Sequence, residues 1–249
     1  MLTKDMAICI RAVDYSETSQ IVTLFTRDTG KIGAIAKGSK RLKSTFDGPI
    51  EILSHGQILF ADSNKDTLAT LTEFQQEPTL LNLRKNLFAL YCCYFAAELV
   101  NGLIHDYDPH PELFESFLQF LQNAGRHETR HGMLAALILF QLGLLNEIGL
   151  QPVLTHCANC KTKYEYRASS IEHQVYFSSS ANGLVCRDCE INFADKIRLS
   201  KDVATCLTNL KQIPASTEEI LAEIEKVMVL HLTELFGRPP RMAKHIMGS

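Results

Sequence analysis

Residues 21–36 read Ile21-Val-Thr-Leu-Phe-Thr-Arg-Asp-Thr-Gly-Lys-Ile-Gly-Ala-Ile-Ala36 and predict a β-hairpin. On both sides of Asp28-Thr29-Gly30 the side chains alternate with the two-residue period of a β-strand. A short turn sequence between two such runs is typical of consecutive antiparallel strands. We therefore expect the chain to begin as β-structure.

Further runs with the same period lie before and after this hairpin. They are centred on Met6–Ile10, Ile50–Ile52, Gln57–Phe60 and Leu68–Thr72, and turn residues such as Asp47-Gly48-Pro49 separate them. About five short strands, with no helix between the early ones, predict a small antiparallel barrel or sandwich. We expect residues 1–79 to form a five-stranded OB-fold β-barrel, because that architecture fits the length.

After Pro78 the apolar spacing becomes helical, which predicts an α-helical domain over residues 80–249. The expected helices cover 83–104, a segment that begins at Pro111, 131–148, a segment capped by Ser200, and a last segment capped by Ser216 with Glu219 and ended by Gly237. Residues at about 150–195 interrupt this pattern as an insertion. The predicted fold class is therefore α+β and multidomain.

The composition predicts a globular protein of the cytoplasm. The chain has 249 residues, of which 46% are hydrophobic and 21% are charged, and the N-terminus shows no secretory signal. The longest apolar stretches, Leu87–Val100 and Met133–Leu145, are too short to cross a bilayer. In a reducing compartment, eight cysteines predict thiols or metal ligands rather than disulfides.

Two C-x2-C pairs are the strongest chemical signal. Cys157-Ala-Asn-Cys160 and Cys186-Arg-Asp-Cys189 are separated by 25 residues. Each tight turn aims two sulfurs at one point, and two such turns supply the tetrahedral thiolate set of a structural Zn²⁺ site. We expect one structural zinc ion in a ribbon-like loop. An iron–sulfur cluster, two disulfides and unrelated thiols are the alternatives.

The sequence predicts no catalytic centre. A zinc ion held by four thiolates has no open position for water or substrate. His110-Pro111-Glu112 followed by Cys157 imitates part of a zinc deaminase signature, but histidine and not proline precedes that cysteine. Gly33 to Lys40 imitates a phosphate loop, but Ser39 comes before Lys40, the reverse of the required order.

Basic residues gather in one short part of the predicted barrel, although the whole chain has a net charge of −3. The cluster consists of Arg27, Lys31, Lys37, Lys40, Arg41 and Lys43, and only Asp28 opposes it. Such side chains can neutralise several phosphates, which predicts salt-sensitive, sequence-independent contact with a nucleic acid. The alternative is a solvated basic face with no ligand. No aromatic residue lies inside the cluster, so base stacking is not predicted.

The order of several motifs along nearly the whole chain resembles the RecO family of bacterial DNA repair proteins. The matching segments are Tyr15-Ser16-Glu17-Thr18, Thr23-Leu24-Phe25-Thr26, Gly30-Lys31, the segment from Ala36 to Ser44, Gly149-Leu150-Gln151-Pro152, the segment from Phe177 to Val185, and the two cysteine pairs. One departure is Lys161, which stands where a glycine commonly follows the second cysteine.

The resemblance implies a DNA repair and recombination mediator that is not an enzyme. It implies binding of single- and double-stranded DNA, annealing of complementary strands, and loading of RecA together with RecR and the C-terminal tail of the single-stranded-DNA-binding protein SSB. DNA contacts would fall on Lys37, Lys40, Arg41 and Lys43, with Arg27 and Lys31 as further candidates. Localisation would be cytoplasmic and nucleoid-associated. The alternative is a zinc-stapled protein–protein scaffold with little intrinsic DNA affinity.

Overall fold

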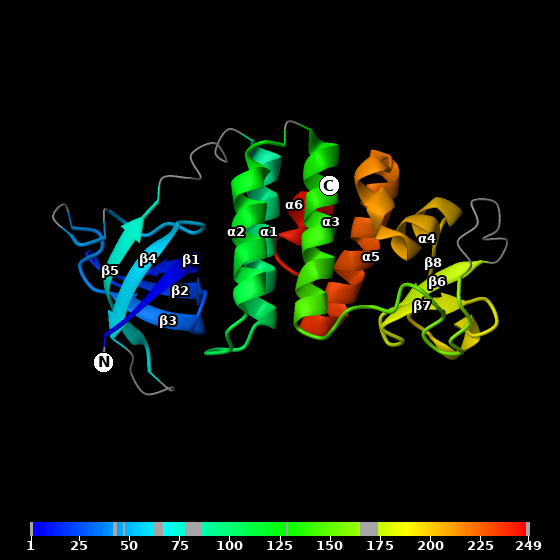
Figure 1. Ribbon diagram of the computed structural model, residues 1–249, viewed down its shortest axis with the longest axis horizontal. Coiled ribbons are helices and arrows are strands. Elements are labelled where there is room, and N and C mark those ends of the chain that lie inside the picture. The colour runs from blue at the N-terminus through cyan, green and yellow to red at the C-terminus, as the bar shows by residue number, and fades with distance from the viewer. Residues whose placement is uncertain are drawn as a thin grey trace. The chain divides into compact units, whose positions relative to one another are not determined.

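The structure is a computed structural model, and it describes residues 2–41, 44–46, 48–61, 67–77, 86–127, 129–164 and 174–247. The chain forms two compact units, Met1–His127 and Glu128–Ser249 (Figure 1). The expected boundary near residue 79 lies outside the described residues. No helix among the described ranges combines the length and the hydropathy needed to cross a bilayer.

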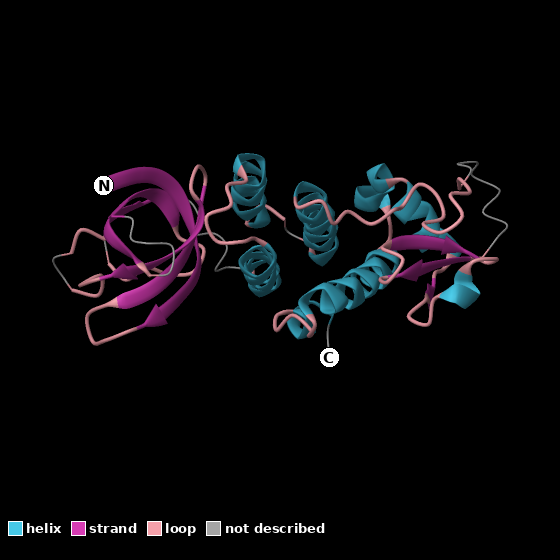
Figure 2. Ribbon diagram, turned by 90° about the horizontal axis from the view of Figure 1, so that it is seen from below, coloured by secondary structure: helices cyan, strands magenta, loops and turns pink. Residues whose placement is uncertain are grey.

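The first unit contains a closed five-stranded barrel, shown in magenta in Figure 2. Its strands are β1 (Leu2–Asp14), β2 (Gln20–Thr26), β3 (Gly30–Ala36), β4 (His55–Ala61) and β5 (Ala69–Gln76). They follow the order β1-β2-β3-β5-β4 around the barrel, and all pairs are antiparallel except β3 with β5. This arrangement fits the predicted OB-fold and confirms the fold class of the first part of the chain.

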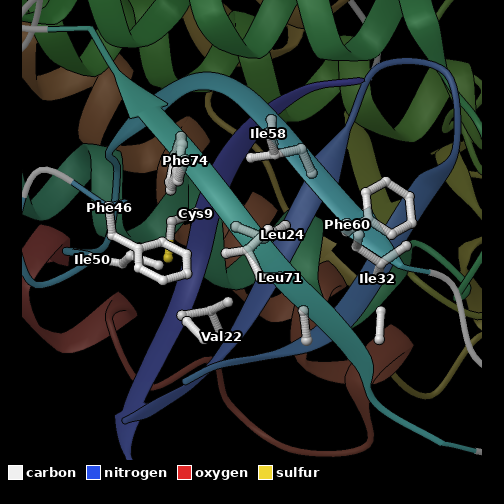
Figure 3. Packing of buried hydrophobic residues seen from close by; sticks show 14 residues of the cluster. Cys9, Val22, Leu24, Ile32, Phe46, Ile50, Ile58, Phe60, Leu71 and Phe74 are labelled. Atoms are coloured by element: carbon white, nitrogen blue, oxygen red, sulfur yellow. The ribbon is translucent and has the colours of Figure 1, made fainter. Parts of the chain in front are cut away.

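The barrel closes around a packed apolar core. In β3, buried and partly exposed residues alternate strictly, as the two-residue period requires. The core side chains come from all five strands and from the segment between β3 and β4 (Figure 3); the labelled ones are Cys9, Val22, Leu24, Ile32, Phe46, Ile50, Ile58, Phe60, Leu71 and Phe74. This interior leaves the outer face of the barrel as the surface on which a ligand can bind.

Ile50 and Ile52 form no strand, contrary to the expectation from their spacing. Ile50 is 1% exposed and belongs to the barrel core. Its backbone pairs with a side chain instead of a neighbouring strand: its N–H donates to Gln20 Oε1 at 2.9 Å, and its carbonyl accepts from Gln20 Nε2 at 3.1 Å. Gln20 thus satisfies the polar groups that a strand partner would otherwise satisfy.

Two helices, α1 (Leu87–Leu103) and α2 (Pro111–Ala124), complete the first unit. As predicted, Pro111 occupies the first helical turn of α2. The helices contact the β2–β3 hairpin: the rings of Phe25 and Phe114 lie 5.8 Å apart, and the N–H of Tyr107 donates to the carbonyl of Lys31 at 2.9 Å. The hairpin end of the barrel is therefore covered by the α1–α2 pair.

The second unit consists of helices and one small sheet. Its helices are α3 (Arg130–Glu147), α4 (Lys201–Thr208), α5 (Glu218–Phe236) and α6 (Ala243–Met247), with short 3-10 helices η2 (Glu190–Asn192) and η3 (Leu210–Ala215). The sheet has the order β7-β6-β8, formed by β6 (Val175–Ser178), β7 (Gly183–Cys186) and β8 (Ile197–Arg198). This confirms a helical region that carries a cysteine-containing loop.

The expected helix ends are mostly observed. Ser200 caps α4, and Gly237 ends α5 in the left-handed conformation with φ of 66°. The predicted cap of α5 was wrong by one residue: Thr217 accepts from the N–H of Ile220. Ser216 is occupied elsewhere, because its hydroxyl donates to the carbonyl of Gln212 at 2.9 Å and contacts Cys206 Sγ.

A buried carboxyl joins α3 and α5 and predicts a pH dependence of stability. Gln141 Nε2 donates to both Glu225 oxygens at 2.9 and 3.0 Å, while Gln141 Oε1 is buried and has no hydrogen-bond partner among the described residues. Burial raises the pKa of Glu225 from 4.5 to about 8, and the protonated carboxyl can donate to an amide oxygen. Because the folded state holds this proton more tightly than the unfolded chain, the stabilisation is complete at acidic pH and is lost as the pH rises from 4.5 to about 8.

Glu225→Gln removes this titration and keeps the hydrogen-bonding shape. We expect the variant to lose less stability than the native protein between pH 5 and pH 8, because no buried group has to give up a proton. Urea unfolding monitored at several pH values measures the difference. Parallel pH profiles of the two proteins would show that Glu225 is ionised in the native state.

Candidate nucleic-acid interface and metal centre

Four cysteines of the second unit meet at one point. The sulfurs of Cys157, Cys160, Cys186 and Cys189 all lie within 4.8 Å of one another. Cys160 and Cys186, which come from different pairs, have their sulfurs 3.7 Å apart, and all four are free thiols. The predicted convergence of the two pairs is therefore confirmed as a possible metal site.

Backbone pairing brings the two pairs together. The N–H of Val153 donates to the carbonyl of Asn182 at 2.8 Å, and the N–H of Ala158 donates to the carbonyl of Leu184 at 2.8 Å. Gly183 has a φ of 153°, and a Cβ there would lie 2.4 Å from the carbonyl oxygen of Val153. The turn Cys157–Cys160, hereafter the first knuckle, therefore lies beside β7. The turn Cys186–Cys189, the second knuckle, begins at the last residue of β7.

The donor set fits a tetrahedral thiolate-bound ion. Zn–S bonds of about 2.3 Å place neighbouring sulfurs about 3.8 Å apart. Polar hydrogens point at the sulfurs: the N–H of Cys186 lies 3.4 Å from Cys157 Sγ, and Asn159 Nδ2 lies 3.2 Å from Cys189 Sγ. Lys161 adopts the left-handed φ of 65° that a glycine at this position would favour, and its N–H donates to the Cys157 carbonyl. The departure from the family pattern leaves the knuckle intact.

The structure brings together three of the residues predicted to contact DNA. Lys37, Lys40 and Arg41 lie in one turn directly after β3, hereafter the basic turn (residues 37–41). Lys43 lies outside the described residues. Arg27 and Lys31 lie at the opposite end of β3, where α1 and α2 contact the barrel.

The basic turn is fixed to the β1–β2 loop. The N–H of Gly38 donates to Ser19 Oγ at 3.2 Å, and the N–H of Lys40 donates to the carbonyl of Thr18 at 3.1 Å. Ser39 is fully buried, and its hydroxyl donates to Gln20 Oε1 at 3.0 Å. These bonds pre-organise the backbone that carries the cations. The sequence gives little sign of them, because the partners lie about twenty residues apart in the chain, in the β1–β2 loop and at the start of β2.

The cations differ in their charge partners. Lys31 donates to the carbonyl of Asn101 at 2.8 Å, pairs with Asp106 at 3.2 Å, and has a side chain only 13% exposed. Arg27 pairs with Glu115 at 3.3 Å, and Lys40 with Asp14 at 2.8 Å.

Two cations of the basic turn keep their charge available. Lys37 and Arg41 are exposed, and within the described part of the chain no ion pair is recorded for either. The side chain of Arg41 lies over Gly38, where an added Cβ would lie 3.5 Å from Arg41 Cδ. Both can therefore meet an anion without first breaking an ion pair with any residue that the structure describes.

Comparison with known proteins identifies both halves of the chain. Residues 1–77 match the family model described as Recombination protein O N terminal, and residues 84–244 match Recombination protein O C terminal. DNA repair protein RecO of Rhodopirellula baltica is 34% identical over 215 residues, which cover 85% of this chain and 77% of that protein. DNA repair protein RecO of Bacillus subtilis is 30% identical over 246 residues, covering 95% and 91% respectively. The chain therefore belongs to the RecO family of DNA repair proteins.

Proposed function

We propose that this protein binds single- and double-stranded DNA through the basic turn and anneals complementary strands during recombinational repair. It has no catalytic residue in this role. The observation that carries the proposal is a pair of exposed cations, Lys37 and Arg41, on a backbone fixed to a closed barrel. Pre-organised cations release the counterions of phosphates, which supplies sequence-independent affinity.

Annealing follows from the same electrostatics. Two DNA strands repel each other through their phosphates, and pairing requires that repulsion to fall while the base edges stay free. Cations that contact phosphates leave the Watson–Crick edges of the bases accessible. The protein thus accelerates base pairing without any covalent bond being made or broken.

The four cysteines are proposed to hold one structural Zn²⁺ ion. Cys157, Cys160, Cys186 and Cys189 fill its tetrahedral shell, so the ion supplies folding energy to the insertion and no reaction. Atomic emission of the purified protein tests the identity of the ion. One zinc per chain supports the assignment, whereas iron together with visible absorbance would indicate an iron–sulfur cluster instead.

Membership of the family also supports a set of partners. We propose that the protein acts in the cytoplasm, at the nucleoid, with RecR and with the C-terminal tail of SSB, and that together they load RecA onto single-stranded DNA. The DNA contact is assigned to the first unit.

Charge reversal in the basic turn tests the DNA contact. Lys37→Glu with Arg41→Glu is expected to weaken binding of both DNA forms by more than about tenfold at about 50 mM salt, and to slow annealing, because two phosphate contacts become repulsive. Fluorescence anisotropy of a labelled oligonucleotide measures the affinity, and quenching between labelled complementary strands measures annealing.

The matched control is Lys211→Glu with Lys226→Glu, which changes the net charge equally at two exposed lysines of the second unit. It is expected to retain most of the affinity. Equal loss in both double variants would mean that only net charge matters. A native protein that binds RecR or an SSB tail peptide but no DNA would favour the scaffold instead.

A further inference from the structure

Tyr15 is the most exposed aromatic side chain described on the barrel, at 63% of its surface, and it stands in the β1–β2 loop. Val13, two residues before it at the end of β1, is 46% exposed. Both side chains are exposed, so the end of β1 and the start of the loop after it present apolar surface to solvent. Neither residue is needed for barrel packing, because the barrel interior is filled by other side chains.

The apolar surface continues across the neighbouring strands. Val13 is the register partner of Ile21 on β2, and Ile21 is the register partner of Ile35 on β3. Both isoleucines are partly exposed, while the residues beside them in sequence are buried. We call Tyr15, Val13, Ile21 and Ile35 the outer stripe, which crosses three adjacent strands on the outside of the barrel.

The basic turn borders the outer stripe. Lys37 follows Ile35 by two residues and lies directly after the end of β3. On the other side, the ammonium of Lys40 lies 2.8 Å from the carboxylate of Asp14, the residue next to Tyr15. Hydrogen bonds from the backbone of the basic turn to the β1–β2 loop hold the two segments together. Apolar surface and exposed positive charge are therefore side by side on a rigid scaffold.

This combination matches the chemistry of a single strand of DNA. An unpaired strand presents flat apolar base faces beside a row of phosphates, and aromatic side chains next to cations bind it by stacking and charge. On OB-folds, the face formed by strands 2 and 3 and the loop between strands 1 and 2 receive oligonucleotides. The outer stripe lies on that face, and Tyr15 lies in that loop.

We propose that the outer stripe is a base-contacting track for single-stranded DNA, with the Tyr15 ring as its stacking platform and the basic turn holding the adjacent phosphates. This inference rests on the proposed DNA contact and adds strand selectivity to it. In a duplex the base faces are stacked on each other, so Tyr15 contributes nothing there, whereas Lys37 and Arg41 contribute to both DNA forms.

Removal of the ring separates the two contributions. Tyr15→Ala is expected to lose about tenfold in affinity for single-stranded DNA and to keep its affinity for double-stranded DNA. Tyr15→Phe is expected to bind as the native protein does, because stacking needs the ring and not the hydroxyl. An alanine variant that binds single strands with native affinity would overturn the proposal.

The chain contains no tryptophan, which permits a direct optical test. Tyr15→Trp places a single tryptophan on the stripe, and its fluorescence is expected to be quenched as single-stranded DNA saturates the protein, because stacked bases quench indole. Leu2→Trp is the matched control: Leu2 is 59% exposed at the opposite end of the same strand. Its emission is expected to stay constant.

Anisotropy shows when binding of the Tyr15→Trp protein is saturated. If its indole emission is not quenched at saturation, the outer stripe does not contact bases, while the proposed function still stands. Failure of the proposed function gives a different pattern: the native protein binds neither DNA form, or the Lys37→Glu and Arg41→Glu variant binds both as well as the native protein does.

Discussion

Replacing Cys157 by serine is expected to abolish stoichiometric metal binding and to unfold the cysteine-containing loop of the second unit. Cys157 is fully buried, and its sulfur accepts a hydrogen bond from the N–H of Cys186, so it links the two cysteine pairs and is one of the four proposed metal ligands. Metal binding to such a site is folding energy, and loss of one ligand is expected to cost about 5 kcal/mol or more. Elemental analysis and thermal unfolding measure the two effects.

Cys206→Ser is the control for this substitution. Cys206 is also buried, but its sulfur contacts Ser216 Oγ and lies outside the four-cysteine cluster. The control is expected to keep one metal ion per chain and most of its stability. If Cys157→Ser retains full metal content and a native melting temperature, the four thiols are not a structural metal site.

The second large effect is expected at Gly30, where the β2–β3 hairpin turns. Gly30 has a φ of 85°, and a Cβ there would lie 2.5 Å from the carbonyl carbon and oxygen of Asp108. Gly30→Ala therefore combines a left-handed backbone cost of about 1–2 kcal/mol with a clash against the main chain of Asp108, which cannot move aside as a flexible side chain can. We expect the total destabilisation to be about 3–4 kcal/mol, measured by urea unfolding.

Gly149→Ala isolates the backbone cost. Gly149 has a similar φ of 74°, but no atom of the described residues lies within 4 Å of the position that its Cβ would take. We expect this control to lose only about 1 kcal/mol. If the two substitutions cost the same, the segment around Asp108 does not pack against the hairpin as described.

Features set by local chemistry were predictable from the sequence. The hairpin over residues 21–36 follows from a two-residue period, the start of α2 from Pro111, and the end of α5 from Gly237. The cysteine cluster follows from spacing, because a C-x2-C turn can direct both sulfurs to one point wherever it occurs. Each of these signals is contained within a few residues.

Features set by distant contacts were not predictable. Ile50 has the spacing of a strand residue, but Gln20, thirty positions away, takes its hydrogen bonds. Lys31 belongs to the same basic cluster as Lys37 in the sequence, yet it lies against the carbonyl of Asn101. Charge density along a sequence counts cations without their partners, so it cannot tell a cation held within the fold from one that faces solvent.

The division of the basic residues has a functional consequence. Arg27 and Lys31 face carboxylates of the α1–α2 pair and serve to join helices to barrel. Lys40 is tied to Asp14 and keeps the basic turn beside the β1–β2 loop. We therefore propose that Lys37 and Arg41 are the residues of the basic turn that contact phosphate.

The salt dependence of DNA binding tests most directly whether Lys37 and Arg41 make the phosphate contacts. The measured quantity is the slope of log K against log salt concentration on a single-stranded oligonucleotide, for the native protein and for Lys37→Gln with Arg41→Gln. The slope is about −0.7 per phosphate contact on a single strand, so its magnitude is expected to fall by about 1.4 in the double variant, which loses two contacts. A double variant with the native slope and the native affinity would contradict it.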